Sequence, residues 1–203
     1  MEKEISIDAL KEVVNIGTGQ AATSLSEILN QKIMINVPEA KFVPLEQISE
    51  QLGGSDKQII GVYFQTTGEL ESRILLIFER ETGHNLATML TGNKPPMNEP
   101  LGDLERSAIM ELGNIIANSY INAMSQLLGI KLYPSVPFYA EDMLGAVIDF
   151  LIVEISQVAD YSLLLKTKMI AESVDLNGSL IIFPDETFLK RLFAKLGIES
   201  PSR

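Results

Sequence analysis

Cysteine is absent from the 203-residue chain, and histidine occurs once, at His84. Without cysteine, disulfide bonds, thiolate metal sites and a cysteine nucleophile are excluded. A lone histidine without neighbouring cysteine or acidic partners is more often a surface or helix-end residue than a ligand. A Ser-His-Asp triad would have to use His84, and neither a nucleophile elbow nor a glycine-rich phosphate loop accompanies it. The sequence therefore argues against conventional hydrolases and nucleotide-binding proteins.

Long hydrophobic runs are also absent. The longest, AVIDFLIV and SLIIF, are far too short to span a bilayer, and the charged start MEKEISID is not followed by a signal-peptide core. We therefore expect a soluble, cytoplasmic protein without a membrane partner. Net charge is −11 and the sequence pI is near 4.6, so nucleic acid would be repelled, whereas a partner that presents lysine or arginine would be attracted.

The composition is that of an ordinary globular protein, with 46% hydrophobic and 21% charged residues. At this length there is room for one sizeable domain or for two small, closely fused ones. Hydrophobic periodicity and turn residues predict an order of elements that restarts after a linker at 91–103. Helices are expected at 6–30, 81–90, 103–128 and 185–196, and strands at 32–38, 41–48, 58–68, 70–79, 131–137, 145–156, 161–172 and 177–183.

This order suggests two copies of one unit, and a shift of 99 residues aligns them without a gap. Seven positions are then identical: Glu12 with Glu111, Asn15 with Asn114, Ile16 with Ile115, Ser26 with Ser125, Lys32 with Lys131, Val37 with Val136 and Pro38 with Pro137. We therefore expect a single domain over 1–203 that consists of two repeats, about 5–98 and 104–197.

Each long helix is divided into an apolar and a polar stripe when residues are placed at 100° per position. The apolar stripes, expected to face the core, contain Leu10, Val13, Val14, Ala21, Leu25 and Ile28 in the first helix and Ile109, Leu112, Ile116, Tyr120, Ala123 and Leu127 in the second. The polar stripes contain Asp8, Glu12, Asn15, Gly19, Thr23 and Ser26, and Ser107, Glu111, Asn114, Asn118, Asn122 and Ser125. Gly17 lies in the apolar stripe, where a missing side chain would let another element pack closely.

The polar stripes differ from an ordinary solvated helix face. They are rich in Gly, Asn, Ser and Thr, which are poor helix formers at exposed positions, they lack Lys and Arg, and both keep a carboxylate and an amide three residues apart. Such a flat, short-chained surface favours docking of another protein. An amide is a poor general base, but it can orient a water beside an anionic phosphoryl group without repulsion, and a carboxylate can pair with a partner's lysine.

These residues match the signature of the CheC family of chemotaxis phosphatases, whose relatives include CheX and the flagellar switch protein FliY. The signature is Asp or Ser, three residues, Glu, two residues, Asn, twenty-two residues and Pro. Asp8–Glu12–Asn15–Pro38 fits it, and Ser107–Glu111–Asn114–Pro137 fits it again. The chain resembles the family over about residues 5–197. No FliN-type domain follows the last helix, and we expect CheC rather than FliY for this reason.

The resemblance implies an α/β protein of the α+β type with pseudo-twofold symmetry, in which two long motif helices are exposed on a central, mostly antiparallel sheet. It implies a phosphatase acting on the phospho-aspartate of the response regulator CheY, and a second partner, the receptor deamidase CheD. Asn15 and Asn114 would orient water for in-line attack on phosphorus, and Glu12 and Glu111 would pair with a lysine of CheY. Mg²⁺ would belong to CheY, so no cofactor or metal ligand is expected on this chain.

The other two signature positions have less direct roles. Asp8 and Ser107 would support the start of each motif helix, or they would be ordinary polar residues of the first turn. Pro38 and Pro137 would shape the strand that follows, or they would simply break a strand end.

The motifs diverge directly after the asparagine, where the first continues at 17–19 with GTG and the second at 116–118 with IAN. Gly19 and Asn118 occupy the same place and would belong to the partner surface, and this divergence would make the two sites unequal. Two other functions are considered. One is a non-catalytic adaptor that holds CheD or occupies CheY, which would not need the asparagines, and the other is a structural part of the flagellar motor.

Overall fold

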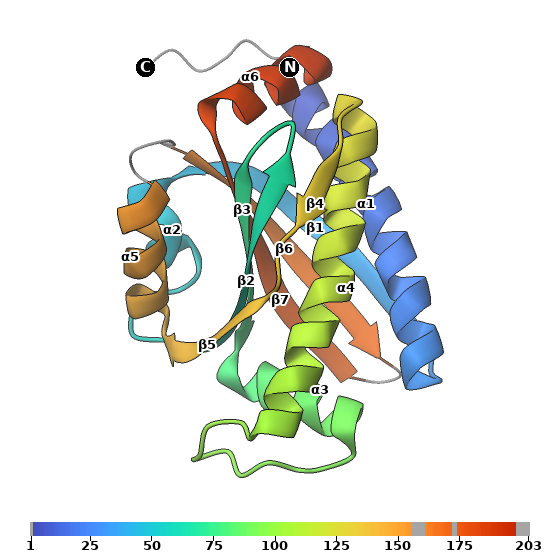
Figure 1. Ribbon diagram of the computed structural model, residues 1–203, viewed down its shortest axis with the longest axis vertical. Coiled ribbons are helices and arrows are strands. Elements are labelled where there is room, and N and C mark those ends of the chain that lie inside the picture. Colours follow the sequence, from blue (N-terminus) through green and yellow to red (C-terminus); the bar gives the residue numbers. More distant parts are fainter. Residues whose placement is uncertain (1, 156–160, 172–173, 198–203) are drawn as a thin grey trace.

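The computed structural model describes residues 2–155, 161–171 and 174–197, and for residues 2–10, 12, 13, 16, 154, 174 and 175 it describes the backbone alone (Figure 1). The helices are α1 (Glu2–Leu29), α2 (Ile48–Gln51), α3 (Arg80–Thr91), α4 (Asp103–Leu128), α5 (Leu144–Ile155) and α6 (Glu186–Leu196). The strands are β1 (Ile33–Pro44), β2 (Gln58–Gly68), β3 (Ser72–Glu79), β4 (Leu132–Pro134), β5 (Phe138–Met143), β6 (Tyr161–Ala171) and β7 (Val174–Pro184). A 3-10 turn covers Leu45–Gln47.

The strands form one sheet in the order β1-β6-β7-β3-β2-β4, and β5 also pairs with β2. Each of the strand pairings described is antiparallel. The predicted α+β fold with a mostly antiparallel sheet is therefore confirmed. Across the described ranges, no helix is long and apolar enough to cross a membrane.

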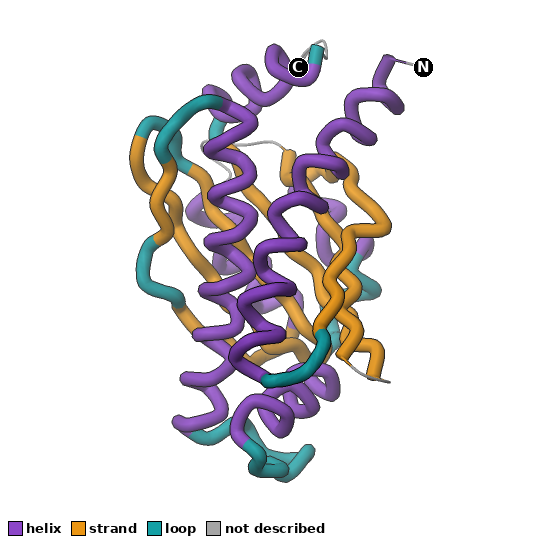
Figure 2. The backbone as a smooth tube through the Cα atoms, turned by 90° about the vertical axis from the view of Figure 1, so that its right-hand side faces the viewer, coloured by secondary structure: helices purple, strands orange, loops and turns teal. Residues whose placement is uncertain are grey.

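Helices cover both faces of this sheet. On one face α1 and α4 lie side by side and run in opposite directions (Figures 1 and 2). Because successive strand side chains alternate between faces, β3 directs Ile74, Leu76 and Phe78 into the core beneath these helices. Its Leu75 and Ile77 enter a second core on the opposite face, which α2 and α5 close. The two motif helices thus rest on a sheet that is buried on both sides.

The sheet register repeats between the two halves of the chain. β1 pairs with β6 in the same way as the β4–β5 segment, 99 residues later, pairs with β2. In β1 the register slips by one residue between Asn36 and Glu39, around Pro38, and in the later segment it slips equally between Pro134 and Phe138. Each half therefore carries a β-bulge at its motif proline. The repeat boundaries, about 5–98 and 104–197, stay a prediction.

The pairing of β3 with β7 is symmetric about one residue pair. Leu76 pairs with Leu180, and on either side of this pair Ile74 meets Ile182 and Phe78 meets Gly178. A shift of 104 residues exchanges the two flanking pairs. The two halves of the chain therefore meet through equivalent strands at the middle of the sheet.

The predicted core-facing stripes are confirmed with one exception. The described members of both stripes are buried or packed against the core, as for Val14, Ala21, Leu25, Ile109, Leu112, Ile116, Tyr120, Ala123 and Leu127. Ile28 is the exception, because its side chain is 59% exposed and Leu29 packs against the core in its place. Gly17 lies where α1 crosses α4: an added Cβ would stand 2.8 Å from Ala123 Cβ and 2.8 Å from the Ser119 carbonyl oxygen.

The strand predicted at 145–156 is wrong, since this segment is helix α5. Its buried residues, Leu144, Val147, Ile148, Leu151 and Ile155, recur at helical spacing. The continuous apolar run AVIDFLIV hid this spacing, because short apolar runs fit a buried strand and a buried helix equally well. The strands predicted at 32–38 and 41–48 are likewise wrong in part: both fall in one strand, β1, which ends at Pro44, and residues 45–48 belong to the 3-10 turn and α2. Pro38 lies at the bulge of β1 rather than at a strand end. β5 was not predicted.

The surface position expected for His84 is wrong, because its side chain, in α3, is only 1% exposed. Its Nε2 atom lies 3.7 Å from Glu141 Oε1, and Arg80 Nε lies 3.3 Å from the same oxygen. The other carboxylate oxygen of Glu141 accepts a 2.8 Å hydrogen bond from the Tyr139 hydroxyl and a 3.0 Å bond from the Leu101 N–H. Burial, followed by the carboxylate of Glu141, raises the pKa of Tyr139. This buried cluster joins α3 and β5 to the segment before α4.

Candidate functional site

The two motifs lie on adjacent helices, α1 and α4, which Figure 2 shows side by side in front of the sheet. Asn15 and Glu111 are exposed, and Asn114 is half-buried. The side chains of Asp8 and Glu12 lie outside the described part of the structure. Among the described motif residues, the structure therefore presents one carboxylate and both amides on the helical layer.

The carboxamide of Asn15 is held by the strand that follows its helix. The Val37 N–H donates a 3.2 Å hydrogen bond to Asn15 Oδ1. Val37 and Pro38 lie at the bulge of β1, where neither has a register partner on β6, so the Val37 N–H is available to a side chain. Pro38 has no N–H to satisfy, which suits a bulge. The spacing of twenty-two residues between the asparagine and the proline thus places a backbone donor against the motif amide.

The carboxamide of Asn114 is held by a different donor. Asn118 Nδ2 donates a 2.9 Å bond to Asn114 Oδ1 and a 2.8 Å bond to the Asn114 carbonyl oxygen. Gly19 stands at the equivalent position of the first motif, and an added Cβ there would meet nothing within 4 Å. Gly19 is exposed, as predicted, and Asn118 is half-buried and engaged with its own helix. A role for either residue in a partner surface stays a prediction.

The remaining signature residues occupy places that differ from the expectation. α1 begins at Glu2 and α4 begins at Asp103, so Asp8 and Ser107 both lie beyond the first turn of their helices. Neither residue is therefore in the first turn of its helix, where both were expected. Pro137 is half-buried in the segment that joins β4 to β5, at the same bulge position as Pro38.

A charged cluster follows the first motif proline. Glu39 forms ion pairs of 2.8 Å with Lys41 and 3.0 Å with Lys166. Hydrogen bonds from these two lysines hold the pKa of Glu39 below its usual value of 4.5. The carboxylate therefore stays ionised and fixes the strand directly after the bulge to β6.

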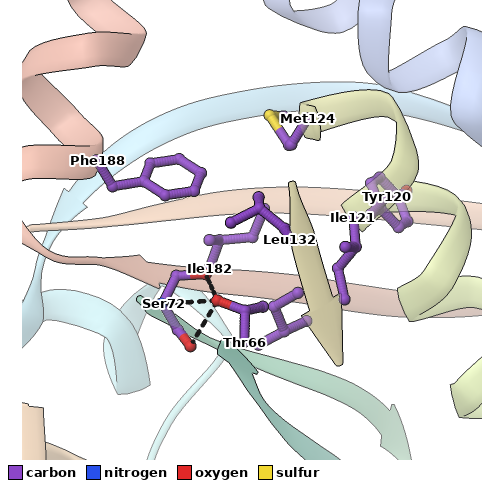
Figure 3. A pocket seen from close by; sticks show the side chains of 9 residues that line it. Thr66, Ser72, Tyr120, Ile121, Met124, Leu132, Ile182 and Phe188 are labelled. Carbon is purple, nitrogen blue, oxygen red and sulfur yellow. Dashed lines mark hydrogen bonds between the residues drawn. The ribbon is translucent and has the colours of Figure 1, made fainter. Parts of the chain in front are cut away.

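The described structure has a small pocket of about 10 Å³ beneath α4, away from the motif residues (Figure 3). It is lined by Thr66, Ser72, Ile74, Tyr120, Ile121, Met124, Leu132, Ile182 and Phe188. Two of its polar side chains bond each other, with Thr66 Oγ1 lying 2.9 Å from Ser72 Oγ. A cavity of this size holds at most about one water molecule.

The described residues also contain no group of three or more His, Asp or Glu side chains that could hold a metal ion. This finding does not test the expectation that Mg²⁺ is bound by CheY, which stays a prediction. The described glutamate and asparagine side chains of the motifs are two neutral amides, Asn15 and Asn114, and one exposed carboxylate, Glu111.

Comparison with known sequences gives the family. The model of the CheC-like family matches residues 5–41 and 104–139, which contain the two motifs in full. The CheY-P phosphatase CheC of Bacillus subtilis is 34% identical over 199 residues, which cover 96% of this chain and 95% of that protein. The chain belongs to the CheC-like family. The family predicted from the two motifs is thereby confirmed.

Solved structures agree with this family at the level of the fold. The FliY structure from Thermotoga maritima matches with a TM-score of 0.73 at 23% identity, over 95% of this chain and 96% of that one. A complex of CheX with CheY, BeF3 and Mg²⁺ from Borrelia burgdorferi contains a chain that matches with a TM-score of 0.52 at 18% identity, over 84% of this chain and 96% of that one. This CheC-like chain therefore shares its architecture with FliY and CheX.

Proposed function

We propose that this CheC-like protein is a phosphatase that dephosphorylates the phospho-aspartate of CheY. The observation that carries the proposal is the pair of motif asparagines, each with its carboxamide oxygen held by a donor of the chain itself. The printed name of the Bacillus subtilis relative, CheY-P phosphatase CheC, and the CheX–CheY complex support CheY as the substrate protein. The proposed enzyme is a protein aspartyl-phosphate phosphatase.

The proposed role of the asparagines follows from the atom that is held. Because Oδ1 accepts a bond from within the chain, the carboxamide plane is fixed and the Nδ2 group, with its two N–H donors, remains for a ligand. A neutral donor can hold a water beside an anionic phosphoryl group, whereas a carboxylate in its place would be repelled. Phosphoryl transfer depends mainly on such positioning and on neutralisation of charge.

The reaction is hydrolysis of an acyl phosphate. The oxygen of the positioned water attacks phosphorus in line, and the bond between phosphorus and the aspartate oxygen of CheY breaks. The products are inorganic phosphate, which takes up the proton of the water, and the free aspartate carboxylate. The Mg²⁺ expected on CheY would neutralise the phosphoryl oxygens, and this chain would supply the aligned water.

The glutamates of the motifs would anchor the partner. Glu111 is exposed and stands three residues before Asn114 on α4, so it is accessible to a lysine of a docked protein. Glu12 has the same spacing from Asn15. An ion pair at this place fixes where the phosphoryl group lies relative to the amide. CheD as a second partner stays a prediction.

The decisive experiment measures phosphate release from phosphorylated CheY with wild-type protein, Asn15→Ala, Asn114→Ala and the double variant. Each single variant is expected to keep the activity of the other site, and the double variant is expected to dephosphorylate CheY no faster than CheY does alone. Asn98→Ala is the matched control, since Asn98 is an exposed asparagine between α3 and α4, outside both polar stripes. Undiminished activity of the double variant would refute the proposal. Binding of CheY without faster release by the wild type would indicate the adaptor.

A further inference from the structure

The two sites have the same motif residues but different donors on the motif amide. In the first site the donor is a main-chain N–H from the neighbouring strand, at Val37. In the second site the donor is the side-chain amide of Asn118, four residues further along the same helix. Both bonds end on Oδ1 of the motif asparagine, so the two donors accomplish the same orientation by different routes.

The strand next to the second motif explains why a different donor is needed there. Val37 and Val136 are equivalent by the shift of 99, yet the side chain of Val37 is 3% exposed and that of Val136 is 78% exposed. The backbone before Val136 is turned by other bonds: the Ser135 N–H donates to the Gln65 carbonyl oxygen at 2.7 Å, and the Ser135 hydroxyl donates to the Val136 carbonyl oxygen at 2.9 Å. The residue equivalent to the Val37 donor therefore lies in a different local structure.

The bonding of Asn118 uses the whole capacity of its amino group. A primary amide carries two N–H donors, and Asn118 Nδ2 lies 2.8 Å from the Asn114 carbonyl oxygen and 2.9 Å from Asn114 Oδ1. The first contact fixes Asn118 to the helix, and the second fixes the carboxamide of Asn114. Side-chain pairs at this i, i+4 spacing are neighbours on a helix surface. Gly19 cannot make either contact, because it has no side chain.

We infer that Asn118 is a positioning residue of the second site, where its side-chain amide sets the orientation of Asn114 that the Val37 N–H sets for Asn15 in the first site. This inference rests on the proposed function, because it gives the carboxamide orientation a consequence for the water. Asn118 acts through Asn114 and need not touch CheY. The second site can therefore be changed through one side chain, whereas the donor of the first site belongs to the main chain.

The test uses the Asn15→Ala background, in which only the second site can work, and measures kcat and KM for phosphate release from phosphorylated CheY. Asn118→Ala removes one hydrogen bond to Asn114 Oδ1, and a net bond of ordinary strength corresponds to about a threefold to tenfold lower kcat. KM is expected to stay within about twofold, because docking does not depend on the bond. Asn118→Asp keeps the shape, replaces the donor by an acceptor facing two oxygens, and is expected to lower kcat further.

Asn118→Ser separates positioning from a structural role. A serine can still bond the carbonyl oxygen four residues earlier, as the Asn118 amide does, but it leaves Asn114 Oδ1 without a donor. If Asn118 acts only on the helix, Asn118→Ser restores kcat, which would overturn the inference. If Asn118 orients Asn114, kcat stays low. Thermal unfolding of each variant, with Asn122→Ala as control, checks that folding is unchanged.

The outcomes for the inference and for the proposed function are distinct. Loss of activity in Asn15→Ala with Asn114→Ala, together with a low kcat in all three Asn118 variants, supports both. The same loss combined with an unchanged kcat in Asn118→Ala and Asn118→Asp overturns the inference and leaves the proposed function standing. A raised KM with an unchanged kcat also overturns it, since it would make Asn118 a docking residue. Full activity of the double asparagine variant overturns both.

Discussion

The two motif helices pack closely at Gly17, and replacing this glycine is expected to have the opposite effect on stability from replacing Gly19. Replacing Gly17 by alanine would place a methyl group 2.8 Å from Ala123 Cβ and 2.8 Å from a backbone oxygen of Ser119. Overpacking of this kind costs about 1–3 kcal/mol. Alanine is favoured over glycine inside a helix by about 1 kcal/mol. The net expectation is a loss of up to about 2 kcal/mol.

Gly19→Ala is the internal control for this prediction. Gly19 lies on the same helix, two residues further on, and an added Cβ meets nothing within 4 Å. Only the helix preference then acts, so this variant is expected to gain up to about 1 kcal/mol. For a chain of this size, 1 kcal/mol corresponds to a shift of about 2–4 °C in Tm.

The assay is urea or thermal unfolding of wild type, Gly17→Ala, Gly19→Ala and Gly17→Ala with Ala123→Gly. The last variant removes the clash between the two Cβ atoms and leaves the contact with the Ser119 oxygen, so it tests whether the first clash carries the cost. In a double-mutant cycle, Gly17→Ala and Ala123→Gly together should then destabilise the protein less than the sum of their separate effects. If Gly17→Ala and Gly19→Ala raise Tm equally, helix preference alone decides, and the reasoning about the helix crossing is refuted.

Two further predictions concern charged residues. Because ion pairs lower the pKa of Glu39, its contribution to folding is present above its usual value of 4.5 and is lost as pH falls through the lower folded value. The stability difference between wild type and Glu39→Gln, measured by urea unfolding, should therefore shrink from pH 6 to pH 3, and a constant difference would contradict this. Glu111→Gln, assayed in the Asn15→Ala background, should raise KM for phosphorylated CheY about twofold to fivefold at low salt and leave kcat unchanged, because exposed ion pairs contribute about 0.2–1 kcal/mol. A lower kcat with the same KM would assign Glu111 to the chemistry instead.

The sequence predicts most of the helical layer because its signals are local. The polar and apolar stripes of α1 and α4 follow from spacing along the helix. Left-handed glycines end α4 at Gly129 and α6 at Gly197, in agreement with the helix ends predicted at 128 and 196. The motif itself is a set of spacings within one segment. Such signals need no knowledge of the rest of the fold.

The parts that were missed depend on contacts between distant segments. α5 was predicted as a strand because its apolar run is continuous. Only its packing on the sheet face opposite α1 and α4 shows which of its residues are buried. His84 was expected at the surface or at a helix end because it has no partner nearby in the sequence, whereas its neighbour in the structure, Glu141, is 57 residues away along the chain. The bond from the Val37 N–H to Asn15 could not be predicted without the bulge of β1. The contact of Asn118 with Asn114 could have been, since the i, i+4 spacing was visible in the sequence.

The pairing of Leu76 with Leu180 gives the molecule the geometry of a twofold dimer within one chain. In a true dimer of identical subunits every substitution appears twice, so both active surfaces must change together. Here the two halves are separate parts of one sequence, and they meet through equivalent central strands, β3 and β7. Each surface can therefore accept a substitution that the other does not share. Gly19 in one half and Asn118 in the other are such a pair. A symmetric fold thus supports two surfaces whose sequences can diverge independently.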